Sequence, residues 1–179
     1  MAREDWLTVK KVLVTEAKRL SGAGAHAILI ASNTMHIYAE AVEEAAGAPV
    51  LHIADAAGER IVAGSVRTVG LLGTRYSMEK DFYRSRLRER FGIECLIPDE
   101  GQREKINSII FTELCQGKFV DASRRFVIDA ARELISRGAQ GVVLACTELP
   151  LIVSQEDLSV ARFDTMAVHA EAGVRFLTG

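Results

Sequence analysis

The chain has 179 residues, of which 49% are hydrophobic and 26% are charged, and its formal net charge is −2. This composition is typical of a globular protein, and the length suits one large domain or two small α/β lobes. No basic block points to nucleic acid, and no apolar run is long enough to span a membrane. The three cysteines lack paired spacing and the amino terminus lacks an apolar leader, so we expect reduced thiols and a cytoplasmic location.

Hydrophobic periodicity predicts helices and strands that alternate along the chain. In chain order we expect a helix over 7–20, a strand over 27–31, a helix over 39–46, a strand over 49–53, a helix over 55–63, a strand over 66–72, a helix over 77–91, a strand over 93–97, helices over 100–115 and 123–136, a strand over 141–145, a strand over 161–163 and a helix over 165–177. This alternation is typical of an α/β fold in which parallel sheets are flanked by helices.

Two segments match position by position. Residues 24–32 read GAHAILIAS and residues 138–146 read GAQGVVLAC, and both follow a predicted helix. Each runs from Gly-Ala through an aliphatic strand to a small hydroxyl or thiol residue, Ser32 or Cys146. We therefore predict a duplicated helix–strand–turn unit, with Ser32 and Cys146 facing each other across a site between two pseudo-symmetric lobes.

The two predicted lobes are unequal. A strand–helix–strand set precedes the second copy of the repeat, whereas almost nothing precedes the first copy. We expect a first lobe of residues 1–65 and 165–179 that is incomplete, and a second lobe of residues 66–164.

Cys146 stands at the carboxyl end of a predicted strand, where open α/β sheets bind their ligands. A helix starting just beyond it would lower the pKa of the thiol below its ordinary value of about 8.5. Thr147 and the free N–H groups of the turn are suited to holding a carboxylate, and Asn33 and Thr34 occupy the equivalent turn after Ser32. Two acid/base groups on opposite sides of a small acid could remove a proton from one face of a carbon and return it to the other.

Simpler interpretations stand beside this one. Cys146 alone fits an inert core thiol, and Ser32 alone fits a helix cap. Cys95 and Cys115 lie in apolar segments and are expected to be structural. The four histidines show no ligand spacing, so we expect no metal, and no cofactor motif is present.

Several short segments together resemble the aspartate/glutamate racemase family, whose members need no cofactor. They are Ser-Asn-Thr-Met-His at 32–36, Glu-Leu-Cys-Gln-Gly at 113–117, Ser-Arg at 123–124, Cys-Thr-Glu at 146–148, Phe-Asp-Thr at 163–165 and His-Ala-Glu at 169–171. The resemblance runs over nearly the whole chain. It implies two lobes with the substrate between them, and a pair of cysteines that work on opposite faces of the amino-acid α-carbon.

The resemblance also assigns roles. It places Cys146 at the second cysteine of the pair. The positions implied to line the substrate site are Asn33, Thr34, Thr147 and Glu148, with Lys118 and His169 as further contacts for a substrate carboxylate.

Two departures from the family pattern bear on activity. Ser32 replaces the first cysteine, and a hydroxyl is a weaker acid than a thiol, so the Ser32 face is expected to work slowly. The family's glycine-rich first strand and turn are expected to lie before the start of this sequence.

Three hypotheses follow. The first is a racemase of aspartate, glutamate or a related amino acid, acting as a homodimer on a small molecule. The second is a single-cysteine decarboxylase on the same scaffold, although Thr147-Glu148 keeps the racemase pattern. The third is a non-catalytic homologue that binds a small acid or self-associates.

Overall fold

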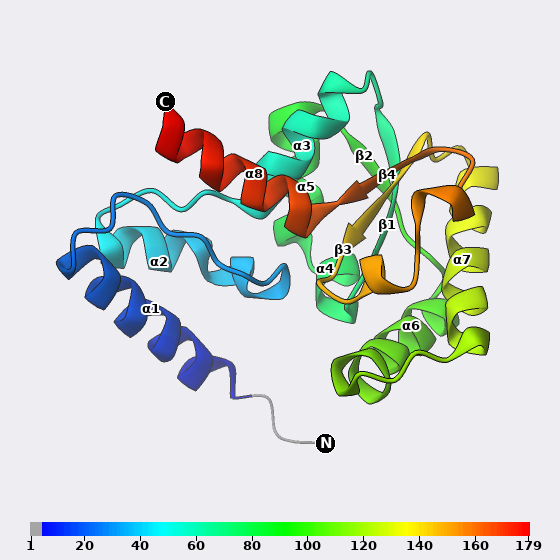
Figure 1. Ribbon diagram of the computed structural model, residues 1–179, viewed down its shortest axis with the longest axis horizontal. Helices are drawn as coiled ribbons and strands as arrows, with labels where there is room; N and C mark the ends of the chain where they lie inside the picture. The colour runs from blue at the N-terminus through cyan, green and yellow to red at the C-terminus, as the bar shows by residue number, and fades with distance from the viewer. Residues whose placement is uncertain (1–4) are drawn as a thin grey trace.

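A computed structural model describes residues 5–179 and contains a four-stranded parallel sheet (Figure 1). The strand order is β2-β1-β3-β4. The bounds are β1 Thr68–Gly73, β2 Glu94–Leu96, β3 Gly141–Ala145 and β4 Ala161–Asp164. The expected parallel α/β fold is confirmed.

Helices cover both faces of this sheet. Helices α6 (Glu100–Thr112) and α7 (Asp121–Ser136) lie on one face, and α3 (Ile53–Ala63), α5 (Asp81–Phe91) and α8 (Thr165–Thr178) lie on the other (Figure 1). All five residues of β3 are buried. Val142 and Leu144 enter the core under α6 and α7, whereas Val143 and Ala145 enter the opposite core. A strand buried on both faces requires such an uninterrupted aliphatic run.

The amino-terminal part of the described chain has its own small core. Helix α1 (Trp6–Gly22) packs on α2 (Ala39–Ala46), which follows the 3-10 helix η1 (Thr34–Tyr38). The core between them comprises Ala17, Ile28, Ile30, Ala39, Val42, Ala46, Ala48 and Val50. Figure 1 shows α1 and α2 to one side of the sheet.

The strands expected over 27–31 and 49–53 are wrong. The two segments meet only in an isolated parallel bridge between Ile28 and Val50. Within residues 5–179 no further strand pairs with them, and a two-stranded pair alone is marginal. The Leu29 side chain is consequently 43% exposed although the sequence pattern suggested full burial.

The single helix expected over 77–91 is also wrong, because the chain breaks at Lys80. Helix α4 (Arg75–Glu79) starts at Thr74, whose side chain caps it, and α5 starts at Asp81. Met78 enters the core under α6 and α7, whereas Tyr83 enters the core on the other face of the sheet. One straight helix could not supply both cores, and the extended backbone of Lys80 provides the change of direction.

The remaining elements are short. After α6 comes the 3-10 helix η2 (Leu114–Gln116), and after β3 come η3 (Leu149–Leu151) and η4 (Gln155–Asp157). No helix in residues 5–179 is long and apolar enough to cross a membrane. The division into lobes at residues 65 and 165 stays a prediction; α3 and α8 both contribute to the core on the sheet.

Gly73 gives a test of the contact between β1 and β3. A Cβ added there would lie 2.7 Å from the carbonyl oxygen of Ala145. We expect Gly73→Ala to lower the free energy of unfolding by about 1–3 kcal/mol, because the two strands must separate. Gly22→Ala is the matched control, since a Cβ there meets nothing within 4 Å, and should change stability by less than about 0.5 kcal/mol. Urea unfolding measures both, and equal stability of the two variants would refute the tight contact.

Candidate functional site

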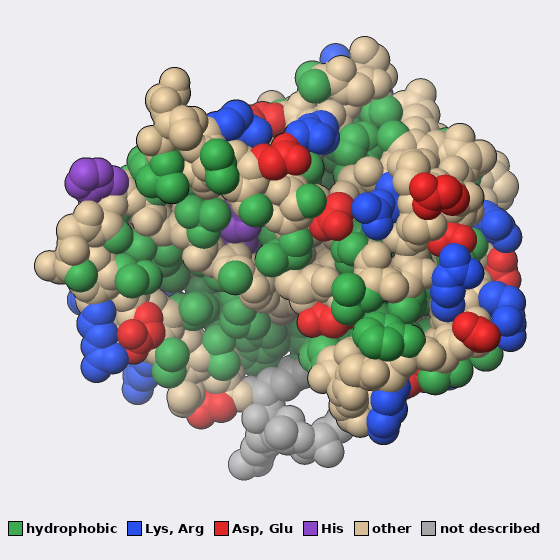
Figure 2. All heavy atoms as spheres, in the orientation of Figure 1, with side chains coloured by type: hydrophobic (Ala, Val, Ile, Leu, Met, Phe, Trp, Pro, Cys, Tyr) green, Lys and Arg blue, Asp and Glu red, His purple; other side chains and the backbone are tan. Residues whose placement is uncertain are grey.

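A cavity of about 400 Å³ lies at the carboxyl ends of β1 and β3. It is lined by Asp5, Trp6, Val9, Ala31, Ser32, Asn33, Thr34, Met35, Thr74, Tyr76, Ile110, Phe111, Cys115, Cys146, Thr147 and Glu148. Figure 2 shows the hollow between the α1–α2 part and the sheet, with hydrophobic side chains in its wall. The position is the one at which open parallel sheets bind small ligands.

The cavity brings together the two turns singled out in the sequence. Ser32, Asn33 and Thr34 reach it from the turn before η1. Cys146, with Thr147 and Glu148, reaches it from the turn after β3.

Two of the proposed site residues lie outside this lining. Lys118 is exposed, and its Nζ donates to Gln116 Oε1 at 2.9 Å. His169 is buried in α8, and its Nε2 donates to the carbonyl oxygen of Leu51 at 2.6 Å. Both stay predictions as substrate contacts, without support from the geometry of the cavity.

The surroundings of Cys146 favour the protonated form of its thiol. Its side chain is buried, and Sγ donates to Glu148 Oε2 at 3.0 Å. Burial, followed by the hydrogen bond to Glu148, raises the pKa of Cys146 to about 12. The lowered pKa expected from the sequence is therefore wrong. The chain beyond Cys146 forms only the three-residue η3, which is too short to supply a strong helix dipole.

His36 holds the Ser32 turn in place. Its Nδ1 donates to the carbonyl oxygen of Ser32 at 2.7 Å, and its Nε2 accepts from the N–H of Ile53 at 3.1 Å. These two bonds require the neutral ring with its proton on Nδ1. Burial lowers the pKa of His36 to about 4, which keeps the ring neutral. The Ser32 hydroxyl accepts from the N–H of Met35 at 3.4 Å, a long bond that agrees with partial capping of η1.

Asn33 links the same turn to the start of α8. Its Nδ2 donates to Thr165 Oγ1 at 3.0 Å, and Thr165 Oγ1 donates to the carbonyl oxygen of Leu144 at 2.8 Å. Asn33 Oδ1 is buried, and no described residue donates to it. A buried acceptor without a donor is costly, so this oxygen is suited to a ligand N–H.

Thr34 and Thr74 join the two sides of the cavity, since their Oγ1 atoms lie 2.9 Å apart. Thr74 follows β1 directly and accepts from the N–H of Ser77 at 3.3 Å.

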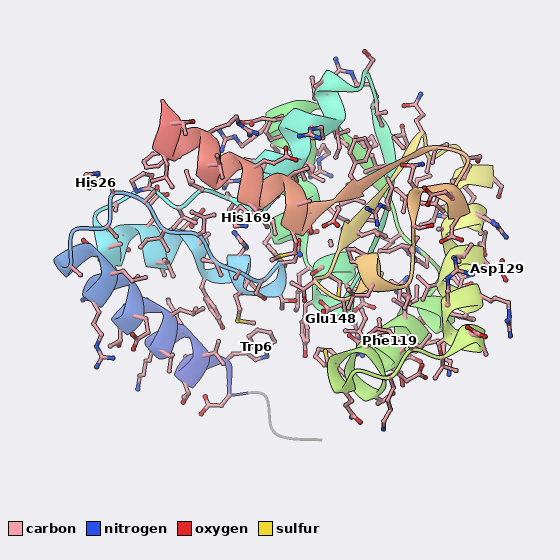
Figure 3. The ribbon with its side chains drawn as sticks, viewed as in Figure 1. Trp6, His26, Phe119, Asp129, Glu148 and His169 are labelled. Carbon is pink, nitrogen blue, oxygen red and sulfur yellow. The ribbon has the colours of Figure 1, made fainter. Side chains whose placement is uncertain are left out.

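Sequence reasoning missed the aromatic part of the wall. Trp6 and Tyr76 pack edge to face with ring centroids 4.8 Å apart, and Phe111 projects from α6. Figure 3 shows Trp6 at the start of α1 and Glu148 on the sheet side of the hollow. Cys115, expected to be structural, is exposed and lines the cavity. No sequence signal pointed to these residues, because they lie in elements distant from both turns.

No described group of three or more His, Cys, Asp or Glu side chains within residues 5–179 could hold a metal ion. His36, His52 and His169 do cluster, with ring centroids 4.6 Å apart for His36–His52 and 5.5 Å for His36–His169. Both ring nitrogens of His36, Nδ1 of His52 and Nε2 of His169 hydrogen-bond to backbone groups, and burial lowers the pKa of each ring.

Two features indicate the class of protein to which the chain belongs. They are the parallel α/β fold and the cavity lined by both the Ser32 turn and the Cys146 turn. The Asp/Glu/Hydantoin racemase family matches residues 1–173, and the chain belongs to this family.

Individual relatives agree with this membership. One similar crystal structure is that of a Yersinia pestis protein assigned as an Asp/Glu racemase. It is 43% identical, with a TM-score of 0.92 over 99% of this chain and 77% of that one. An aspartate racemase homologue from Pyrococcus horikoshii OT3 is 36% identical, with a TM-score of 0.85 over 99% and 78%. The broad specificity amino-acid racemase RacX of Bacillus subtilis (strain 168) is 25% identical over 166 residues, which are 93% of this chain and 71% of RacX.

The pKa of the Cys146 thiol should lie far above that of an ordinary cysteine. We expect its thiolate absorbance, taken as the difference between wild type and Cys146→Ala, to rise only well above pH 9, because the group is buried. Glu148→Gln should lower the pKa by about one unit, because it removes the neighbouring negative charge. Glu156→Gln, an exposed change elsewhere, is the control. A midpoint at or below about 8.5 would refute this description of the site.

The buried histidines should make stability fall in mild acid. An unfolded histidine titrates near 6.5, whereas folded His36 titrates near 4. Between these pH values the unfolded chain binds a proton that the folded chain does not, so the free energy of unfolding decreases as pH falls. His36→Asn should make the decrease shallower by up to about 1.4 kcal/mol per pH unit. Urea unfolding at pH 7, 6 and 5 measures the slope; the exposed His26→Asn should leave it unchanged, and an unchanged slope in His36→Asn would contradict the assignment.

Proposed function

We propose that the chain is a cofactor-independent amino-acid racemase or epimerase that removes and returns the α-proton within this cavity. One observation carries the proposal: Ser32 and Cys146, which end the two copies of the sequence repeat, line the same cavity. A group on each side of a bound α-carbon is what inversion of that carbon requires. The reaction needs no cofactor, because a thiol can act both as acid and as base.

The protonation states of Ser32 and Cys146 predict that the two faces of the α-carbon react unequally. Inversion requires one deprotonated and one protonated group, and both are protonated at rest, since Cys146 has a pKa of about 12 and a serine hydroxyl is a weaker acid. Loss of the Cys146 proton is therefore the step that creates the base. The α-ammonium group of a bound amino acid would displace the thiol from its hydrogen bond to Glu148, and the thiol proton would then pass to solvent in the cavity. The Cys146 thiolate takes the α-proton and becomes a thiol again. The carbanion is then reprotonated by the Ser32 hydroxyl, whose alkoxide regains a proton from solvent, or by the Cys146 thiol with retention.

Binding of the substrate backbone uses the remaining polar groups. An α-ammonium group would supply N–H donors to Asn33 Oδ1 and to Glu148. The Thr147 hydroxyl is available to the α-carboxylate from the same turn as Cys146. These contacts hold the α-carbon between Ser32 and Cys146, which makes proton transfer effectively intramolecular.

The test is exchange of the α-proton for deuterium in D₂O, followed by NMR with L- and D-aspartate, glutamate and methionine. Cys146→Ala should lower exchange about 100-fold or more, because it removes the acid/base group. Ser32→Cys should raise the rate of full inversion relative to exchange with retention, because a thiol replaces the weaker acid.

Cys95→Ala is the control for loss of a thiol, since Cys95 lies in β2 and outside the cavity lining. Equal exchange by wild type and Cys146→Ala would sink the proposal, as would absence of exchange with all six amino acids.

A further inference from the structure

The ionisable side chains of the cavity carry one sign of charge. Among the lining residues that the structure describes, the carboxylates are Asp5 and Glu148, and none is Lys, Arg or His. Asp5 Oδ1 accepts from the N–H of Thr8 at 3.0 Å and Oδ2 from its hydroxyl at 2.5 Å, and these bonds lower the pKa of Asp5. The carboxylate is therefore ionised at neutral pH.

Two basic side chains close in sequence to this lining have partners outside it. Arg75 lies between the lining residues Thr74 and Tyr76, but its Nε donates to Glu79 Oε2 at 3.0 Å. Lys118 follows Cys115 closely, but its Nζ donates to Gln116. Neither belongs to the cavity wall.

The part of the wall away from the Ser32 and Cys146 turns is apolar. Trp6 and Val9 come from α1, Tyr76 from α4, and Ile110 and Phe111 from α6. These three elements close around the space where the side chain of a bound amino acid would extend once its α-carbon lies between the two turns. Burial of an apolar side chain against this wall would favour binding.

We infer that this cavity selects amino acids with an apolar side chain, of the methionine, leucine or phenylalanine type, over aspartate and glutamate. The α-ammonium group satisfies Glu148, but a second carboxylate would meet the apolar wall and the negative charge of Asp5. Moving an ionised carboxylate from water to a largely apolar wall beside another negative charge is costly. The inference names the substrate class of the site proposed above, and so its catalytic part depends on that proposal.

Binding tests the selection separately from catalysis. Isothermal titration calorimetry of the wild-type chain should give dissociation constants for L-methionine and L-phenylalanine at least about tenfold lower than those for L-aspartate and L-glutamate. This difference is equivalent to about 1.4 kcal/mol. Phe111 is half exposed, so Phe111→Arg places a cation in the wall with little effect on folding. This variant should bind L-aspartate more tightly and L-methionine more weakly, and so reverse or remove the preference.

Phe119→Arg is the matched control, because Phe119 is 58% exposed in the loop before α7 and does not line the cavity. Figure 3 labels its position. This variant should keep the wild-type preference. Equal or tighter binding of the acidic amino acids by the wild type would overturn the inference, and so would failure of all four to bind, or an unchanged preference in Phe111→Arg. Selective binding of methionine without α-proton exchange would instead overturn the proposed reaction and leave the selection standing.

Discussion

The parallel pairing of β1 with β3 determines where the chemistry of this chain can occur. Gly73 lies opposite Ala145 in this pair, so the residues that follow, Thr74 and Cys146, leave the sheet at the same edge. Gly73 permits the approach because a side chain there would collide with the carbonyl oxygen of Ala145. Since the carboxyl ends of parallel strands point one way, one register places a thiol and a hydroxyl side by side.

The other side of the cavity is held by hydrogen bonds between side chains and backbone rather than by a sheet. His36 fixes the carbonyl of Ser32 to the start of α3, and Asn33 fixes the same turn to Thr165 at the start of α8. Both bonds depend on neutral, buried polar groups, which are strong only when every partner is present. The position of Ser32 in the cavity wall is thus set by contacts far apart in sequence.

Local patterns predicted the sheet well, because aliphatic runs and turn residues report directly on strands such as β3. They also identified both turns of the cavity. Local patterns failed where a neighbour decides the outcome: residues 27–31 have a strand sequence but lack partner strands in the described chain. The break at Lys80 depends on which core receives Met78 and which receives Tyr83.

The pKa of the Cys146 thiol was predicted wrongly for the same reason. Its pKa depends on the length of η3 and on where the Glu148 side chain points, and neither follows from the residues around Cys146 alone. The aromatic residues of the cavity wall could not be predicted for a related reason. Trp6 lies 140 positions before Cys146 in the chain, and only the packing of α1 brings both residues to the same cavity.

In the proposed reaction, Glu148 would connect substrate binding to proton transfer. The negative charge of Glu148 and its hydrogen bond help to keep Cys146 protonated. An α-ammonium group beside Glu148 would neutralise that charge and compete for the same oxygen, which lowers the cost of forming the thiolate. Burial, the larger cause of the raised pKa, would persist and keep the thiolate poorly solvated and hence strongly basic. We therefore expect the base to form only when an amino acid is present to be deprotonated, so that one carboxylate both recognises the substrate and restrains the thiol until it arrives.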